Sequence, residues 1–450
     1  MARQERFELS ANGLEGRCSI QLSYCRSRDA SFIQTDSGGQ VKIGKKLKFR
    51  NYLEFSRYLD DLGLFHMDLS LGRMEDFVEN WGGKDSYPVI HVVGTNGKGS
   101  TSSYLTAIAQ QSGLKIGTFT SPHFVTPRER ITINSTMLTE EEWCEVANEV
   151  MEIVPDAGLT YFELLTCIAL AAFKNNGVDI AVMEAGLGGR FDATNTIDPD
   201  LTVFTPIGLD HEKVLGSTID LIAADKADAM CAEGVAVTAV QEPEAMEILQ
   251  KRAEELNCNL MLVVADECIS GLNPRLAGEH QKQNAQLACC AWKIFCEKSG
   301  LDFNENSVRT GVEDAFIAGR LQIIEMDRTI ILDGAHNTHA FAALEAELSR
   351  TETRPDAIIF SCMKDKDLGL VKDILSRLTD GPIIACGIPG NERAYPFIEL
   401  AGVLGEKAKA AANIDEALSV LGSGDKTVLI CGSLYLLAAF YTRYPEFLKK

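Results

Sequence analysis

The chain lacks several features that would place a protein outside the cell or in a membrane. Its apolar stretches are strand-sized or interrupted, well short of the roughly 20 residues that a membrane-spanning helix needs. No segment has the pattern of a secretory signal. The 13 cysteines form no Cys-x-x-Cys pair, and an odd number with Cys289 and Cys290 adjacent fits scattered reduced thiols. We therefore expect a cytoplasmic protein without a disulfide framework.

The chain also has no excess of positive charge. Its 43 Lys and Arg residues stand against 64 Asp and Glu residues, which gives a formal net charge of -21 at pH 7. Nucleic acids and membrane surfaces carry negative fields that repel such a protein, so we expect neither as a partner. An anionic ligand must instead be held by local groups.

Residues 1–50 differ in charge from the rest of the chain. They contain 10 Lys and Arg residues against 5 Asp and Glu residues. The acids do not suit an organelle-targeting peptide, so we expect a poorly ordered extension or a start codon assigned too far upstream.

The remaining length is too great for one ordinary core. We expect a larger domain over residues 51–317 and a smaller one over residues 318–450, with the boundary between 311 and 320.

Strands and helices alternate after residue 88, which is typical of a parallel sheet covered by helices on both faces. Two capping boxes are predicted at helix starts, Thr139 with Glu142 and Ser217 with Asp220. The strands that we predict are 88–93, 115–121, 179–185, 201–207, 235–240 and 260–265, and then 321–325, 329–332, 357–362, 382–388 and 427–431. The segment 120–130 is predicted as a basic, proline-broken loop.

The most informative segment is His91 to Thr101, HVVGTNGKGST, a buried strand followed by a glycine-rich turn and a helix. Backbone N–H groups of such a turn and the positive end of the helix converge on an anion. Lys98 would contact the β- and γ-phosphates, with Ser100 or Thr101 toward phosphate and Mg²⁺. The glycine spacing departs from the general P-loop, which leaves a purely structural turn as the alternative.

Several polar residues follow other predicted strands, at the sheet edge where ligands bind in open α/β folds. Glu184 is a candidate Mg²⁺ ligand, with a structural pairing to Arg190 as its alternative. His211 is either a ligand or a hydrogen-bonded structural residue. Arg128 and Arg130 would bind an anionic substrate or lie in a solvated loop.

Taken together, the motifs resemble the folylpolyglutamate synthase and dihydrofolate synthase family of the Mur ligase superfamily, over residues 51 to 445. They occur in the family's order, and the irregular glycine spacing is itself the family's form. The matching segments are GTNGKGS (94–100), TSPH (120–123), ERITIN (129–134), TYFELLT (160–166), EAGLGGRFDATN (184–195), GLDH (208–211), GRLQ (319–322), LDGAHN (332–337) and CGSLYL (431–436).

The resemblance implies a fold and a set of site residues. The fold is α/β, a large P-loop-type parallel-sheet ATPase domain followed by a smaller Rossmann-like α/β domain. The implied ATP-contacting residues are Gly94, Thr95, Asn96, Gly97, Lys98, Gly99, Ser100, Thr101, Asn284, Arg320 and Asp333. The implied Mg²⁺ ligands are Ser121, Glu184, His211 and Lys226, the last carbamylated by CO₂. Carbamylation turns a cation that would repel Mg²⁺ into an oxygen ligand.

The implied substrate positions are Met67, Asp68, Leu69, Thr160, Tyr161, Phe162, Glu163, Phe191, Asp192 and Ala193. The segment DLSLGR (68–73) departs from the family's DLGLER, with Ser70 in place of glycine and Gly72 in place of glutamate. Lys98, Lys226 and His336 are the implied catalytic residues, and His336 is placed near the acyl or glutamate site.

The implied reaction is a ligation driven by ATP. The γ-phosphoryl group passes to a substrate carboxylate, and the amine of L-glutamate attacks the resulting acyl phosphate. The acceptor is dihydropteroate, a folylpolyglutamate or both, and the protein is expected to act as a monomer. The alternatives are a Mur-type ligase acting on a nucleotide-linked sugar and a nucleotide-dependent switch protein.

Overall fold

The larger part of the protein, the first unit, is built on an eight-stranded sheet. The computed structural model describes residues 48–63, 68–83, 86–154, 158–263, 268–276, 278–364, 366, 368–422, 424 and 426–448. The strand order in the first sheet is β4-β3-β2-β5-β1-β6-β7-β8. The strands are β1 (Val89–Val93), β2 (Ile116–Phe119), β3 (Ile131–Ile133), β4 (Thr136–Met137), β5 (Ile180–Glu184), β6 (Leu201–Phe204), β7 (Val235–Thr238) and β8 (Asn259–Leu262).

The central strand β1 is fully buried and runs parallel to β5 on one side and β6 on the other. The carboxyl ends of β1, β2, β5 and β6 therefore share one edge of the sheet. The predicted loop at 120–130 is present and ends in a 3₁₀ turn at residues 127–130, whereas the antiparallel hairpin of β3 and β4 that follows it beside β2 was not predicted. Asn134 and Ser135 make its tight turn, both with positive φ. The strands of two and three residues were too short for a periodic signal.

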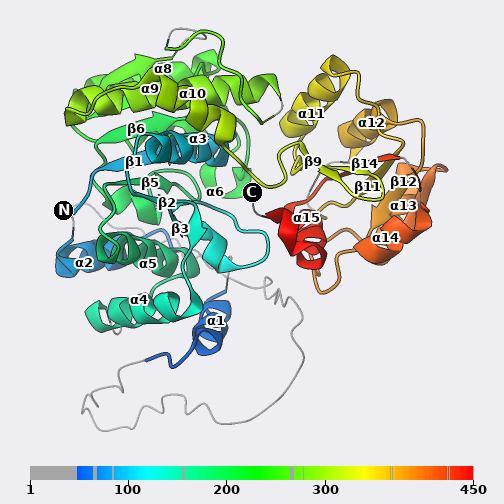
Figure 1. Ribbon diagram of the computed structural model, residues 1–450, viewed down its shortest axis with the longest axis horizontal. Coiled ribbons are helices and arrows are strands. Elements are labelled where there is room, and N and C mark those ends of the chain that lie inside the picture. The colour runs from blue at the N-terminus through cyan, green and yellow to red at the C-terminus, as the bar shows by residue number, and fades with distance from the viewer. Residues whose placement is uncertain are drawn as a thin grey trace, which may run out of the picture.

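Helices cover both faces of the first sheet (Figure 1). The helix α3 packs between α9 and α10 on one face, and α4 packs on α5 on the other. The helices are α1 (Tyr52–Asp61), α2 (Gly72–Trp81), α3 (Lys98–Gln111), α4 (Glu140–Ile153), α5 (Tyr161–Asn175), α6 (Glu212–Leu215), α7 (Ile219–Ala227), α8 (Pro243–Leu256), α9 (Glu279–Ser299) and α10 (Glu305–Asp314), with the short 3₁₀ helices η1 (Pro127–Arg130) and η2 (Ala193–Thr196). No helix among the described residues is long and apolar enough to cross a membrane.

Helix caps explain where several of these helices begin. Thr139 and Glu142 form the predicted capping box of α4. The predicted box at Ser217 was wrong, because Thr218 caps α7 and its side chain accepts from Leu221 N.

Phe49 lies within the segment that we assigned to the extension, yet it is buried and its backbone pairs with the Asn148 side chain. Residues 1–47 lie outside the described residues.

The smaller part, the second unit, is built on a six-stranded sheet with the order β13-β12-β11-β14-β10-β9. All its neighbours are parallel except β9, which runs antiparallel to β10 at the edge. The elements are β9 (Gln322–Glu325), β10 (Thr329–Leu332), α11 (Thr338–Arg350), β11 (Ala357–Phe360), α12 (Gly369–Leu378), β12 (Ile383–Cys386), α13 (Phe397–Leu404), β13 (Ala408–Ala411), α14 (Ile414–Val420), β14 (Thr427–Cys431), α15 (Leu434–Arg443) and η3 (Pro445–Leu448). The sequence prediction missed β13, whose Ala-Lys-Ala-Ala sequence has little strand propensity.

The two units touch through side chains near the carboxyl ends of their strands. The rings of Phe124 and Tyr441 meet edge to face with centroids 5.0 Å apart. In Figure 1 the second unit lies beside the first, with α15 at the contact. The connection runs from α10 to β9, where Ser103 Oγ donates to Phe316 O at 2.9 Å.

Candidate functional site

The turn between β1 and α3 needs glycine at two positions. Gly94 has φ 150° and Gly97 has φ 88°. A Cβ atom on Gly94 would lie 2.0 Å from Thr205 Oγ1, and one on Gly97 would lie 2.4 Å from Asn284 Oδ1. No side chain caps the first turn of α3. The turn is therefore packed tightly against β6 and α9, while the helix keeps N–H groups at its start for an anion.

Two lysine side chains meet at the carbonyl oxygen of Gly94. Lys98 Nζ donates to it at 3.1 Å and Lys226 Nζ at 2.8 Å. Lys226 lies on α7 and is 3% exposed. Burial, and then repulsion from Lys98, lowers the pKa of Lys226 to about 7. A large share of the Lys226 side chains is therefore a neutral amine at neutral pH.

Glu184 ends β5 and points its carboxylate toward the glycine-rich turn. A Cβ atom on Gly99 would lie 3.7 Å from Glu184 Oε2, an oxygen without a hydrogen-bond partner among the described residues. Burial raises the pKa of Glu184 to about 7, although Lys98, the Ser121 N–H group and Arg320 lower it. Arg190 pairs with Asp228, so the alternative that Glu184 pairs with Arg190 was wrong. A buried oxygen of this kind is suited to a cation.

The other predicted metal ligands lie around this carboxylate. Ser121 follows β2, and its N–H group hydrogen-bonds to the Glu184 carboxylate. His211 precedes α6 in a left-handed conformation, and its side chain is 59% exposed, 3.8 Å from Asp210. No group of three His, Cys, Asp or Glu side chains among the described residues could hold a metal ion. Among the predicted ligands, Glu184 supplies a buried carboxylate oxygen and Ser121 lies beside it.

The predicted residues of the second unit are fixed by their own backbone. Asp333 Oδ2 accepts from Leu321 N at 3.0 Å, and Oδ1 accepts from Ala335 N at 2.8 Å. His336 Nδ1 lies 2.8 Å from Gly334 O. Arg320 is close enough to Glu184 to lower its pKa. The strand ends of the two units therefore face each other across the site.

The groups that act on the pKa of Asp210 also come from both units, which again places the two sets of strand ends face to face. Against the effect of burial, His211, Lys366 and His336 lower the pKa of Asp210. Lys366 and His336 belong to the second unit, whereas Asp210 and His211 follow β6 in the first. Lys366 was not among our predicted site residues.

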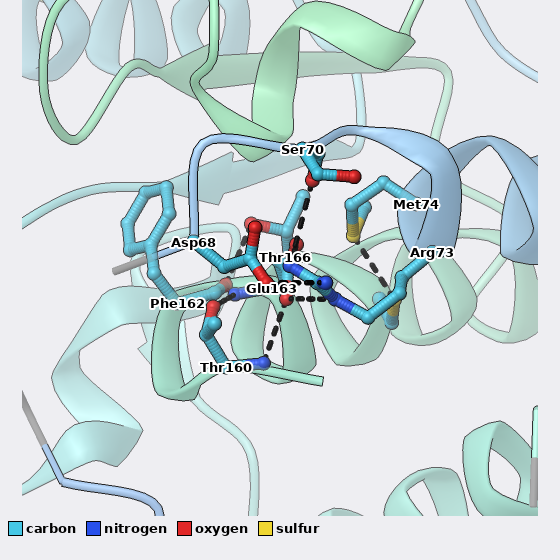
Figure 2. Close-up of polar contacts among 9 residues, drawn as sticks. Asp68, Ser70, Arg73, Met74, Thr160, Phe162, Glu163 and Thr166 are labelled. Atoms are coloured by element: carbon cyan, nitrogen blue, oxygen red, sulfur yellow. Dashed lines mark hydrogen bonds and ion pairs between the residues drawn. The ribbon is translucent and has the colours of Figure 1, made fainter. Parts of the chain in front are cut away.

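Figure 2 shows a network that joins residues 68–70 to the first turn of α5. Arg73 donates two hydrogen bonds to the Glu163 carboxylate, from Nη2 to Oε1 at 2.9 Å and from Nε to Oε2 at 3.2 Å. Its Nη1 also lies 2.8 Å from Asp68 Oδ2. Glu163 Oε2 accepts from Thr160 N at 2.7 Å in a capping box. Arg73 therefore couples two predicted substrate segments.

The remaining predicted substrate residues divide between exposed and buried positions. Leu69 is 57% exposed and Phe191 is 43% exposed, so both offer apolar surface. The Phe162 ring packs on Phe119 with centroids 5.4 Å apart. Asp192 is buried and accepts from Thr194 N at 3.0 Å. Tyr161 and Ala193 are also buried, and Met67 lies outside the described residues.

Two arginines of the site were missed or left undecided by the sequence. Arg73 was not in our predicted set, although its motif keeps the family's arginine while departing from it at 70 and 72. Arg130 was predicted to bind an anion or to lie in solvent. The structure buries it at 4% exposure over the ring of Tyr161.

The site can be compared with known proteins. Residues 92–266 match the Mur ligase middle domain, and residues 319–434 match the Mur ligase glutamate ligase domain. A dihydrofolate synthase/folylpolyglutamate synthase of Bacillus subtilis is 31% identical over 429 residues, which cover 85% of this chain and 98% of that protein.

Solved structures show the same likeness. The structure of E. coli FolC in complex with DHPP and ADP has a TM-score of 0.79 and 29% identity, over 88% of this chain and 98% of that one. A bifunctional folylpolyglutamate synthase/dihydrofolate synthase with Mn, AMPPNP and L-glutamate bound has a TM-score of 0.77 and 27% identity, over 89% and 100%. This chain belongs to the folylpolyglutamate synthase/dihydrofolate synthase family of Mur ligases, which are ATP-dependent glutamate ligases.

Proposed function

We propose that this chain uses ATP to activate the carboxylate of a folate-type acceptor and joins it to L-glutamate, with release of ADP and phosphate. Family membership supports the reaction class. The structural observation that carries the proposal is the buried Glu184 Oε2, which has no partner among the described residues and lies beside the glycine-rich turn. That oxygen suits a cation shared with phosphate oxygens. Action as a cytoplasmic monomer, and the division of the chain at residue 317, are part of the same proposal.

The nucleotide phosphates would lie against residues 94–101. The start of α3 supplies N–H groups, and Lys98 would leave Gly94 O to contact the β- and γ-phosphates. Asn284 lies against Gly97, so it is placed to contact the nucleotide from α9. Arg320 and Asp333 would contact it from the second unit. ADP in the structure of the E. coli relative supports this assignment.

Ser121, Glu184, His211 and a modified Lys226 would hold Mg²⁺. When bound, the ion would neutralise charge on the phosphate oxygens during transfer. Manganese in a related structure supports a divalent metal. The residues fit such an ion only if Lys226 loses its positive charge, because its buried ammonium would repel the cation.

Carbamylation of Lys226 supplies that change. Its neutral amine nitrogen would attack the carbon of CO₂, one proton would leave the nitrogen, and a carbamate with one negative charge would result. The buried position beside Gly94 O protects the group from bulk water. We expect Lys226→Ala to lose activity and to regain part of it with added short-chain carboxylates such as acetate. Equal activity of the wild type and the variant, with and without CO₂, would count against the carbamate.

The protein's own residues would then guide two bond changes. An acceptor carboxylate oxygen attacks the γ-phosphorus and ADP leaves, with Lys98 and the α3 N–H groups stabilising charge on the phosphoryl oxygens. The amine of L-glutamate attacks the acyl carbon, loses a proton, and phosphate leaves. We assign His336 to this second step, and its position at the facing strand end supports the assignment. Approach of the two units would exclude water from the acyl phosphate.

ADP release by the purified protein tests the proposal. Dihydropteroate and a folylmonoglutamate are offered separately, each with and without L-glutamate. Release that requires both an acceptor and glutamate supports the ligase and identifies the acceptor. Release that is indifferent to both would favour a nucleotide-dependent switch, and release that requires a nucleotide-linked sugar would favour a Mur-type ligase.

A further inference from the structure

We propose that Arg130 binds the acceptor carboxylate that ATP activates. The inference rests on the proposed function and names the group that orients the reacting acid. Neither family motifs nor sequence spacing decided between this role and a solvated loop for the arginine. In the structure Arg130 is buried, which excludes the solvated position.

Arg130 is a buried cation without an acidic partner among the described residues. Its side chain is at the end of η1, and the residue is only 4% exposed. The hydrogen bond given by its side chain runs from Nε to His123 Nδ1 at 2.8 Å. Both Nη groups are left without a carboxylate. Burying a guanidinium in this way is costly unless an anion compensates it, which indicates that a negatively charged ligand completes the site.

The groups around Arg130 place that ligand between the metal carboxylate and the substrate helix. Arg130 lies over the Tyr161 ring, with 5.5 Å from Cζ to the centroid. Glu184 and Tyr435 are also near enough to act on its charge. Tyr161 begins α5, Glu184 ends β5, and Tyr435 comes from α15 of the second unit. An anion held by Arg130 would thus lie close to both units and to the proposed metal site.

The neighbouring acid Glu129 is already occupied. Its carboxylate accepts from the N–H groups of Phe124, Val125 and Thr126 at 2.8, 2.8 and 2.6 Å. These bonds shape the loop that carries Ser121 and His123. Glu129 therefore fixes the loop, and the positive charge of Arg130 stays available for a ligand.

Arg128 provides an internal comparison, since it lies in the same loop and bears the same side chain. Its Nε and Nη2 both donate to Leu138 O, at 2.9 and 2.7 Å, and Nη1 lies 3.4 Å from Glu140. Every part of that guanidinium has a structural partner. Arg128 holds the loop to α4, whereas the two Nη groups of Arg130 have no carboxylate partner among the described residues.

A guanidinium suits this task because its planar fork binds a carboxylate through two parallel hydrogen bonds and keeps its charge at any working pH. Such a pair fixes the orientation of the carboxylate. One oxygen can then be presented to the γ-phosphoryl group in line, which raises the rate of the first step without new covalent chemistry. Arg130 would therefore be a substrate-binding residue of the first half-reaction.

The test compares an acceptor with its carboxamide, in which the reacting carboxylate is replaced by an uncharged group. Dihydropteroate and its carboxamide are used, or a folylmonoglutamate and its γ-carboxamide, according to which acid the wild type ligates. Equilibrium affinities are measured for the wild type, Arg130→Gln, Arg130→Lys and the control Arg128→Gln, together with ATP affinity. We expect the wild type to prefer the acid by about 10- to 100-fold.

Arg130→Gln should abolish that preference and lower kcat/KM for the acceptor by a similar factor, with ATP affinity unchanged. Arg130→Lys should keep part of the preference, and Arg128→Gln should keep all of it. A wild type that binds acid and carboxamide equally would overturn the proposal, even if Arg130→Gln failed to fold. So would an Arg130→Gln protein with the wild-type preference. Failure of the ligase assignment is distinguishable, because the wild type would then release no ADP in response to acceptor and glutamate.

Discussion

Two carboxylates at the site, Glu184 of the first unit and Asp333 of the second, are in opposite states. In the first unit, Glu184 Oε2 and Thr101 Oγ1 are buried without partners among the described residues. In the second, both oxygens of Asp333 accept backbone N–H groups. Because buried polar groups are ordinarily satisfied, unsatisfied ones indicate a place that a ligand completes. The Glu184 carboxylate therefore depends on a ligand, whereas the Asp333 carboxylate is already fixed by its own backbone; Ser361 Oγ, directly after β11 in the second unit, is a further buried oxygen without a partner among the described residues.

The two units also differ in the charge that they bring to the site. Lys98 and Lys226 both donate to the same carbonyl oxygen of the glycine-rich turn, and repulsion from Lys98 is one cause of the lowered pKa of Lys226, so this part of the first unit favours a negatively charged ligand. The second unit adds the charge of Arg320 to the same space, where it lowers the pKa of Glu184 and of its own Asp333 against the effect of burial. Substitution of Lys98 or Glu184 should then affect activity with little loss of stability, whereas substitution of Asp333 should affect both.

The largest effect is expected from Lys98→Ala. Its ammonium contacts backbone oxygens of its own loop, so its loss should leave the fold intact. Removal of a charge that stabilises the transferring phosphoryl group should lower kcat by about 10²- to 10³-fold or more. The measurement is ADP release in the presence of acceptor and glutamate, with thermal unfolding as a check. Lys115→Ala is the control, since that lysine also donates to a backbone oxygen but lies away from the site. Near-normal turnover by Lys98→Ala would remove the basis of the nucleotide assignment.

Local patterns made the first half of the site predictable. The strand, turn and helix around Lys98 and the acid that ends β5 are encoded within a few residues each, and parallel strands bring their ends together. Side-chain pairing over long separations was not predictable, because Arg73 and Glu163 are 90 residues apart. The direction of Arg130 was also undetermined, since it depends on how Glu129 folds the loop before it. The hairpin at β3 and β4 became evident only in the structure, because its strands of three and two residues are too short for a periodic signal.

A substitution at Arg73 should show that the first unit also contains structural polar pairs. Glu163 is 4% exposed, and Arg73→Met would leave its carboxylate without a cation. We expect a loss of about 3 kcal/mol in the free energy of unfolding, since breaking a buried pair leaves an uncompensated charge. The KM for the acceptor should also rise, because residues 68–70 lose their anchor.

Urea unfolding of Arg73→Met, Glu163→Gln and the double variant gives the coupling energy between the two residues. The exposed pair Arg252 and Glu255 serves as the control, with an expected coupling below about 1 kcal/mol. If the Arg73 and Glu163 pair coupled as weakly as this control, the pair would not anchor the substrate loop.

A matched pair of amide substitutions tests the comparison between the units directly. Glu184→Gln removes a charge whose Oε2 has no internal partner, so we expect activity to be lost at unchanged stability. Asp333→Asn removes an acceptor from Leu321 N or Ala335 N, so we expect a loss of about 1–2 kcal/mol in the free energy of unfolding. Both are followed by urea unfolding and by ADP release. Equal destabilisation by the two variants would show that the first unit's carboxylate is as structural as the second's.

The smallest effect is expected in the pH dependence of stability, through His91 in the centre of the first sheet. Its Nε2 lies 2.8 Å from Thr194 Oγ1, and its Nδ1 has no partner among the described residues. Burial lowers the pKa of His91 to about 4. In the unfolded chain the His91 imidazole therefore binds a proton below about pH 6.5, whereas in the folded chain it does so only below about pH 4. The free energy of unfolding falls as the pH drops through this window.

His91→Gln should remove this contribution while keeping a donor toward Thr194. We expect the variant to be less stable than the wild type at pH 7, and the difference to narrow by about 1 kcal/mol at pH 5.5. The buried acids Glu184 and Asp192 act in the opposite direction, because their raised pKa values favour the protonated folded state at low pH. The difference between variant and wild type cancels those acids, which both proteins share. A difference in stability that stays constant between pH 7 and pH 5.5 would contradict this prediction. It would mean that His91 binds a proton as readily in the folded protein as in the unfolded chain. Burial in the first sheet would then not make this unit sensitive to acid.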